Sequence, residues 1–131
     1  MFIDASALCS VLLSEKDADH YDARIAAAAM PLTSAVSVFE TVLAVARALD
    51  GDVAGARRAV REYLEASSVV VVSVGEAEVA RALDAFDRYG KGRHPARLNM
   101  GDCFAYACAR THGVPLLFKG DDFRQTDIAF A

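Results

Sequence analysis

Hydrophobic positions recur at helical spacing through much of this chain. Val38, Val42, Val45 and Leu49 follow one another three or four residues apart, which predicts a helix with Ser37 just inside its first turn. Further helices are predicted at residues 7–13, 17–29, about 53–66, 76–89 and 100 to about 111.

Two continuous apolar runs are typical of strands instead. Residues 68–74 read SVVVVSV and residues 114–118 read VPLLF, and such runs indicate strands that are buried on both faces. Phe2-Ile3 and residues 32–34 are shorter segments of the same kind. Strands that alternate with helices predict an α/β fold with three layers, α/β/α, around a central parallel sheet. Residues 1–131 are expected to form a single domain.

Composition and charge narrow the classes of function. The chain has 131 residues, of which 54% are hydrophobic, so it can fill a core. No apolar run approaches the roughly 18 residues of a membrane-spanning helix, and no leader is recognised, so we expect a soluble cytoplasmic protein. The 14 basic and 18 acidic residues give a net charge of −4, which argues against non-specific coating of DNA. The three cysteines form no CxxC pair, which argues against structural zinc.

Acidic residues fall where ligands bind in α/β proteins. Asp4 follows the first apolar segment, Asp121 and Asp122 follow the last strand, Asp102 lies in the first turn of a helix, and Glu40 interrupts an apolar helix. The carboxyl ends of parallel strands meet at one edge of a sheet, so these side chains are expected to converge. Taken singly, Asp102 could be only a helix cap, and the Asp pair at 121–122 could be only turn formers.

A cluster of carboxylates has a definite chemistry. Like charges repel, so either their pKa values rise or a cation binds among them. Oxygen ligands without His or Cys suit Mg²⁺ or Mn²⁺, and a bound ion of this kind supports hydrolysis of phosphodiesters. Asp4 and Asp102 are the expected direct ligands, Glu40 binds the ion or orients the attacking water, Asp121 completes the site, and Ser6 hydrogen-bonds a carboxylate.

With these residues in place, the chain resembles the PIN-domain family, and within it the VapC toxins of bacterial toxin–antitoxin pairs. The similarity lies in FIDASA at residues 2–7, SVFE at 37–40, NMGDCFA at 99–105, LLFKGDDF at 116–123 and TDI at 126–128. The blocks follow the order of the family across nearly the whole chain.

The resemblance implies a Mg²⁺- or Mn²⁺-dependent endoribonuclease that leaves a 5′-phosphate and a 3′-hydroxyl. It places Asp4, Glu40 and Asp102 on the three acidic positions of the family, with Ser6 on the small hydroxyl position beside the first. Asp121 matches the fourth acid, and Asp122 is its alternative. The resemblance also implies a homodimer, an RNA substrate of the tRNA or rRNA class, and a small VapB-like antitoxin whose C-terminal tail covers the cleft.

Other α/β proteins share parts of this pattern. A receiver-like module would use a lysine such as Lys119 near a late strand, but it also needs an Asp after the middle strand, where this chain has Gly75. A haloacid-dehalogenase-like phosphatase needs a second Asp two residues after Asp4, where this chain has Ser6. A PIN-like binding module without catalysis is a further alternative.

One Gly- and Pro-containing stretch, residues 90–95, is expected to be a mobile loop. The basic-type residues in and beside it are Arg88, Lys91, Arg93, His94 and Arg97. They either contact RNA phosphates or only solvate the loop.

Overall fold

The structure, a computed structural model, describes residues 1–131 and contains four short strands, six α-helices and one 3₁₀ turn. In chain order the elements are β1 (Phe2–Ile3), α1 (Ala5–Leu12), α2 (Ala18–Ala26), β2 (Leu32–Ser34), α3 (Ala35–Ala48), α4 (Val53–Ala66), β3 (Val70–Val72), α5 (Glu76–Tyr89), α6 (Met100–His112), β4 (Leu116–Leu117) and η1 (Asp122–Gln125).

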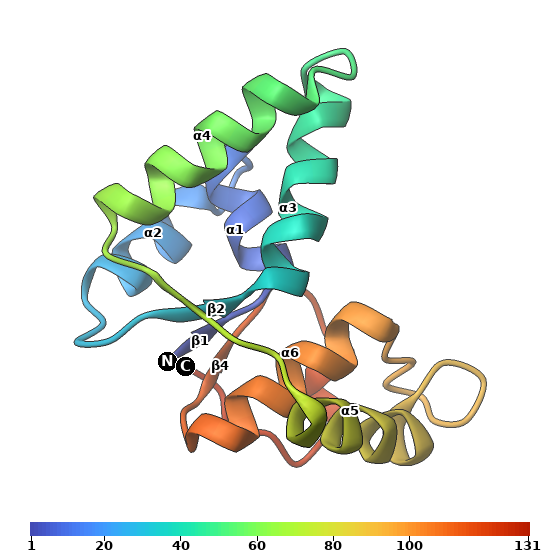
Figure 1. Ribbon diagram of the computed structural model, residues 1–131. Coiled ribbons are helices and arrows are strands. Elements are labelled where there is room, and N and C mark those ends of the chain that lie inside the picture. Colours follow the sequence, from blue (N-terminus) through green and yellow to red (C-terminus); the bar gives the residue numbers. More distant parts are fainter.

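The four strands form one parallel sheet in the order β3-β2-β1-β4. Helices α1 to α4 lie on one face of the sheet, and α5 and α6 lie on the other (Figure 1). Alternate residues of the strands supply the two cores: Phe2 packs with α5 and α6, and Ile3 packs with α1 to α4. The predicted three-layer α/β/α fold with a parallel sheet is therefore confirmed.

Side-chain caps determine where several helices begin. The Asp4 carboxylate accepts a hydrogen bond from the Ser6 backbone N–H, so α1 begins at Ala5. The helix predicted at residues 7–13 therefore begins two residues earlier than expected, because Asp4 is its cap. Asn99 caps α6, and Gly113 ends that helix with a left-handed φ of 63°. None of the helices is long and apolar enough to cross a bilayer.

The strand predicted at residues 68–74 is shorter and more exposed than expected. Only Val70–Val72 form β3, which lies at the edge of the sheet, and Val70 and Val71 are 51% and 48% exposed. The prediction of burial on both faces was wrong here, because a β-branched run favours a strand but does not determine its place in the sheet. The last strand, predicted at 114–118, is reduced to Leu116–Leu117, but it is buried as expected.

The order of the strands predicts where truncation of a side chain costs stability. Ile3 lies in the central strand with no exposed surface, so Ile3→Ala should lower the free energy of unfolding by about 2–5 kcal/mol. Val70→Ala, in the half-exposed edge strand, should cost less than about 1 kcal/mol. Urea denaturation monitored by circular dichroism measures both values, and equal losses for the two variants would contradict this strand order.

Candidate active site

The acidic residues gather at the carboxyl ends of the strands. Asp4 directly follows β1, the strand that pairs with β2 on one side and β4 on the other. The chain leaves β2 into α3, which carries Glu40, and it leaves β4 toward Asp122 in η1. Strands β2 and β3 lie on one side of β1, and β4 lies on the other side. Ligands of open parallel sheets bind beyond the carboxyl end of the strand at which the strand order reverses, so the crevice at the end of β1 is the expected site.

Asp4 is the buried centre of this group, since its side chain is 4% exposed. Its Oδ2 accepts hydrogen bonds from the Ser6 backbone N–H at 2.9 Å and from Ser6 Oγ at 2.5 Å. Burial raises the pKa of Asp4 above its ordinary value, and the charge of Asp122 raises it further, while the bonds from Ser6 oppose the rise. Two donors therefore hold the orientation of a carboxyl group that water cannot solvate freely.

Ser6 is itself tied to the end of β4. The backbone N–H of Lys119 donates to Ser6 Oγ at 3.0 Å. Lys119 Nζ contacts Glu15 at 2.5 Å and Asp17 at 2.6 Å, which joins β4 to the segment between α1 and α2. Ser6 therefore acts as the predicted hydrogen-bond partner of the first carboxylate, and it also links two strand ends.

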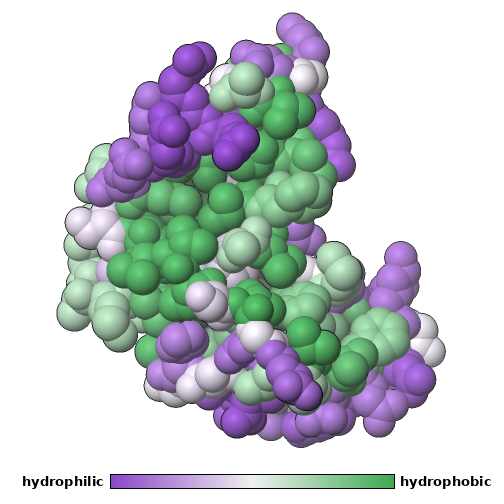
Figure 2. Space-filling view, in the orientation of Figure 1, coloured by the Kyte–Doolittle hydropathy of each residue, from purple (hydrophilic) through white to green (hydrophobic).

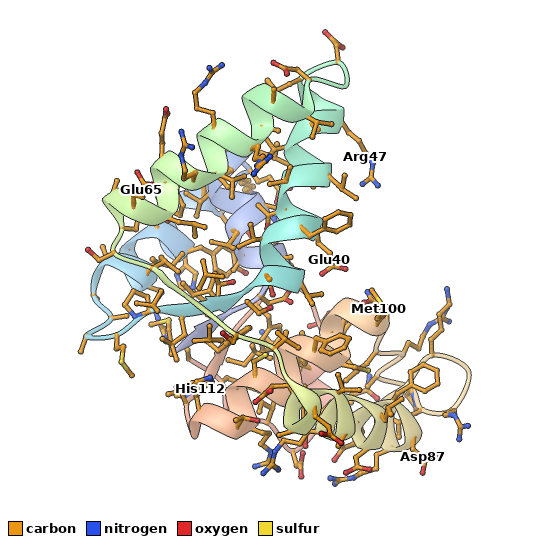
Figure 3. The ribbon with its side chains drawn as sticks, viewed as in Figure 1. Glu40, Arg47, Glu65, Asp87, Met100 and His112 are labelled. Atoms are coloured by element: carbon orange, nitrogen blue, oxygen red, sulfur yellow. The ribbon has the colours of Figure 1, made fainter.

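Glu40 reaches the same place from α3. In Figure 3 its side chain extends from α3 toward the start of α6, where Met100 is labelled. A Cβ atom on Gly101 would lie 2.2 Å from both carboxylate oxygens of Glu40, so any larger residue at that position would displace the Glu40 carboxylate from this place. Burial raises the pKa of Glu40, and the charge of Asp4 contributes to the rise.

Asp102 follows in the first turn of α6. Its Oδ2 accepts from the Asn99 N–H at 2.8 Å, and Asn99 Oδ1 accepts from the Asp102 N–H at 3.0 Å. This capping box is the structural role that could be expected of Asp102 taken alone. Burial nevertheless raises the pKa of Asp102 to about 7 against the effect of the Asn99 bond, and the charges of Asp4, Asp122 and Glu40 add to the rise. Asp102 is therefore both a cap and a member of the acidic group.

Asp121 and Asp122, the two candidates for the fourth acid, differ in their surroundings. The charge of Asp122 raises the pKa values of both Asp4 and Asp102. The Asp121 side chain is 88% exposed and forms an ion pair with Arg124 at 2.9 Å. The identity of the fourth acid stays a prediction, and these contacts support a proposal for Asp122.

Four carboxylates within mutual electrostatic reach fit a hard divalent cation in their chemistry. No group of three or more His, Cys, Asp or Glu side chains is arranged to hold a metal ion directly. Mg²⁺ commonly takes only one or two carboxylates and keeps several waters, so a pair of direct ligands is enough. The hydrogen bonds from Ser6 to Asp4 and from Asn99 to Asp102 engage Oδ2 of each carboxylate.

The largest cavity of the molecule lies elsewhere. A volume of about 650 Å³ opens between α3, α4 and β3, lined by valines such as Val38, Val42 and Val71. It belongs to the broad apolar area that faces the viewer in Figure 2. No carboxylate of the acidic group lines this cavity.

Two features of the site were missing from the interpretation of the sequence. The close approach of the Glu40 carboxylate to Gly101 was not predicted. The link from Lys119 to Ser6 spans 113 residues of sequence, so no local pattern could have indicated it. A glycine in the first turn of a helix, directly before an acid, was the one available signal for Gly101.

The raised pKa of Asp102 predicts how the stability of the protein depends on pH. The pKa of Asp102 is about 7 in the folded protein, against about 3.9 for an unfolded Asp, so the folded state binds the proton more tightly. The stability that this proton provides is complete below about pH 4 and is lost as the pH rises through 7. In EDTA, Asp102→Asn should remove this loss and be more stable than the wild type at pH 8 by about 1–3 kcal/mol.

Thermal denaturation from pH 4 to pH 8 measures the effect. The charge-matched control is Asp121→Asn, which should follow the wild-type pH profile because Asp121 lies outside the acidic group. If Asp102→Asn instead follows the wild-type pH profile, that result would contradict the raised pKa of Asp102 in the folded protein.

Comparisons with known proteins agree with this geometry. The family model described as PIN domain matches residues 1–129. Ribonuclease VapC30 of Mycobacterium tuberculosis is 44% identical over 129 residues, covering 98% of this chain and 96% of that protein. The crystal structure of Mycobacterium tuberculosis VapC20, a sarcin-ricin loop cleaving toxin, superposes with a TM-score of 0.78 at 16% identity over 99% of this chain and 97% of that one.

A toxin–antitoxin complex from Klebsiella pneumoniae contains a chain of the same fold. Its TM-score is 0.71 at 15% identity, covering 99% of this chain and 95% of that chain. The match of the family model over nearly the whole length, together with the VapC relatives, settles the family. The chain belongs to the PIN-domain family, among its VapC ribonucleases.

Proposed function

We propose that this protein is an endoribonuclease, the toxin of a type II toxin–antitoxin pair, and that it hydrolyses RNA phosphodiester bonds with Mg²⁺ or Mn²⁺ at its acidic centre. The observation that carries the proposal is the gathering of Asp4, Glu40 and Asp102, three acids from separate elements, at one place where burial raises the pKa of each and where the charges of Asp4 and Glu40 add to the rise at Asp102. Such repulsion is relieved when a cation binds. The relatives named as ribonucleases support the reaction.

Asp4 and Asp102 are the direct ligands in this proposal. Asp4 is oriented by Ser6 and Asp102 by the N–H of Asn99, so both carboxylates are held before the ion arrives. A bound divalent ion lowers the pKa of a water and stabilises the charge that develops on the phosphate and on the leaving oxygen.

Glu40 and Asp122 complete the site from two other sides. Glu40 lies against the start of α6 beside Asp102, where its carboxylate can accept a proton from the attacking water. Burial raises the pKa of Glu40 above its ordinary value, which makes it a better proton acceptor than an exposed glutamate. Asp122 adds a negative charge that strengthens cation binding without a capping role.

The proposal includes two protein partners. A small VapB-like antitoxin whose C-terminal tail covers the acidic centre is supported by VapC relatives and by the same fold in a toxin–antitoxin complex. A homodimer is supported by the exposed apolar residues Leu83 and Phe86 on α5, which are 65% and 38% exposed. The proposed substrate is a structured RNA of the tRNA or rRNA class.

Cleavage of RNA by the antitoxin-free protein tests the proposal. We expect cutting with Mg²⁺ or Mn²⁺, none in EDTA, and recovery when the ion is restored. Asp4→Asn should reduce the rate by roughly 10²–10³-fold, because the ion contributes several kcal/mol to the transition state. Gel analysis of a labelled tRNA or rRNA fragment measures this. Cleavage that persists in EDTA would contradict the metal mechanism, and binding without any cleavage would favour the inactive PIN-like module.

A matched pair of variants tests the identity of the fourth acid. Asp122→Asn should slow cleavage by roughly 10–100-fold, the usual cost of removing a group that supports a metal site. Asp121→Asn removes the same charge from the neighbouring residue and should leave the rate unchanged, because Asp121 pairs with Arg124. Measuring the cleavage rate as a function of Mn²⁺ concentration separates weaker metal affinity from slower chemistry. A larger loss for Asp121→Asn than for Asp122→Asn would contradict the assignment of Asp122 as the fourth acid.

A further inference from the structure

The basic residues near the α5–α6 loop fall into two groups, those that pair with a carboxylate of this chain and those that do not. Arg88 donates to Asp127 at 3.2 Å and is directed toward the C-terminal segment. Arg93 forms an ion pair with Asp87 at 2.8 Å. Both guanidinium groups are therefore partly neutralised by carboxylates of this chain.

The loop of residues 90–98 is closed by hydrogen bonds rather than left open. Gly90 and Leu98 form a parallel bridge, and the Leu98 N–H donates to the Tyr89 carbonyl at 3.0 Å. His94 Nδ1 accepts from the Ala96 N–H at 3.1 Å, so this imidazole closes the loop. The backbone of the stretch predicted to be mobile therefore forms a closed, hydrogen-bonded loop, and the side chains of Lys91 and Arg97 are exposed on it.

Lys91 and Arg97 are the two cations of this loop that make no ion pair. The Lys91 N–H donates to the Leu98 carbonyl at 3.0 Å, which places Lys91 beside the residue that precedes the Asn99 cap. Arg97 has a left-handed φ of 55° and lies between Ala96 and Leu98, which are 1% and 0% exposed. Both of its neighbours are held in the core, so Arg97 stands outward next to the start of α6.

The chain places the backbone of Arg97 near Asp102, a member of the acidic group. Only two extended residues and one helical turn separate Arg97 from Asp102, which limits the distance between their Cα atoms to about 12 Å. The loop surrounds a cavity of about 450 Å³ that no hydrophobic residue lines. A chain of phosphates bound at the centre would therefore pass this loop within one or two nucleotides.

A third unpaired cation stands on the opposite side of the centre. Arg47 follows Glu40 by seven residues on α3, which is two turns, so both side chains lie on one face of the helix about 10.5 Å apart along its axis. Figure 3 shows Arg47 and Glu40 on the same side of α3, and Met100 across from Glu40 at the start of α6. The outline of the molecule is indented on this side, between the two groups of helices (Figure 2).

The acidic centre alone would repel RNA, since four carboxylates meet there in a protein of net charge −4. Cations on both sides of the centre offset this repulsion for a polyanion that crosses it. We propose that Lys91, Arg97 and Arg47 form a two-sided clamp for the RNA backbone, with phosphates on either side of the scissile bond bound by the α5–α6 loop and by α3. The clamp rests on the proposed function and specifies how the substrate is held.

Salt-dependent binding tests the clamp. The protein carries Asp4→Asn so that a short fluorescein-labelled single-stranded RNA stays intact, and anisotropy gives the affinity between about 50 and 200 mM salt. The test variant is Arg47→Gln, Lys91→Gln and Arg97→Asn, where asparagine tolerates the left-handed backbone. The charge-matched control is Arg57→Gln, Arg58→Gln and Arg61→Gln on α4, and circular dichroism verifies that both fold.

The test variant should lower the slope of log affinity against log salt by about 2, because each phosphate contact to a single strand contributes about 0.7. The control should keep the slope of the parent protein. Equal slopes for the test variant and its parent, or equal losses in both triple variants, would overturn the clamp. If the wild type cuts RNA while these slopes stay equal, only the clamp fails, whereas a wild type that neither cuts nor binds RNA overturns the proposed function itself.

Discussion

The burial of carboxylates around Asp4 is the constraint on which the site depends, and the charges of neighbouring acids add to its cost. The sheet brings the carboxyl end of β1 between those of β2 and β4, and α3 and α6 deliver Glu40 and Asp102 to the same crevice. A folded protein tolerates such a cluster only with raised pKa values or a bound cation. Ser6 and Asn99 donate hydrogen bonds that lower part of the cost while keeping the acids in place.

The same constraint explains features that look unrelated. The Glu40 carboxylate occupies the space beside Gly101 where a Cβ atom would lie, so a larger residue there would displace it. Lys119 is held by Glu15 and Asp17, so its charge does not neutralise the centre while its backbone fixes Ser6. The ammonium group of Lys119 is therefore paired with two carboxylates that do not belong to the acidic group.

Much of this could be predicted from the sequence, because caps, periodicity and strand ends are local signals. The helix at 76–89 was predicted correctly, and the charges of Asp4 and Glu40 act on Asp102 as the expected convergence of these acids requires. The exposure of β3 was not predictable, since a run of valines fits an edge strand as well as a central one. The choice between Asp121 and Asp122 depends on the direction of one turn, which a motif does not record.

Anomalous scattering from crystals soaked in Mn²⁺ tests the central claim most directly, because it locates the ion without any assay of activity. The account predicts a peak in the crevice above β1, within direct ligand distance of Asp4 and Asp102, and its loss in the Asp4→Asn protein. No peak at this position in millimolar Mn²⁺, or a peak bound only by other residues, would contradict it.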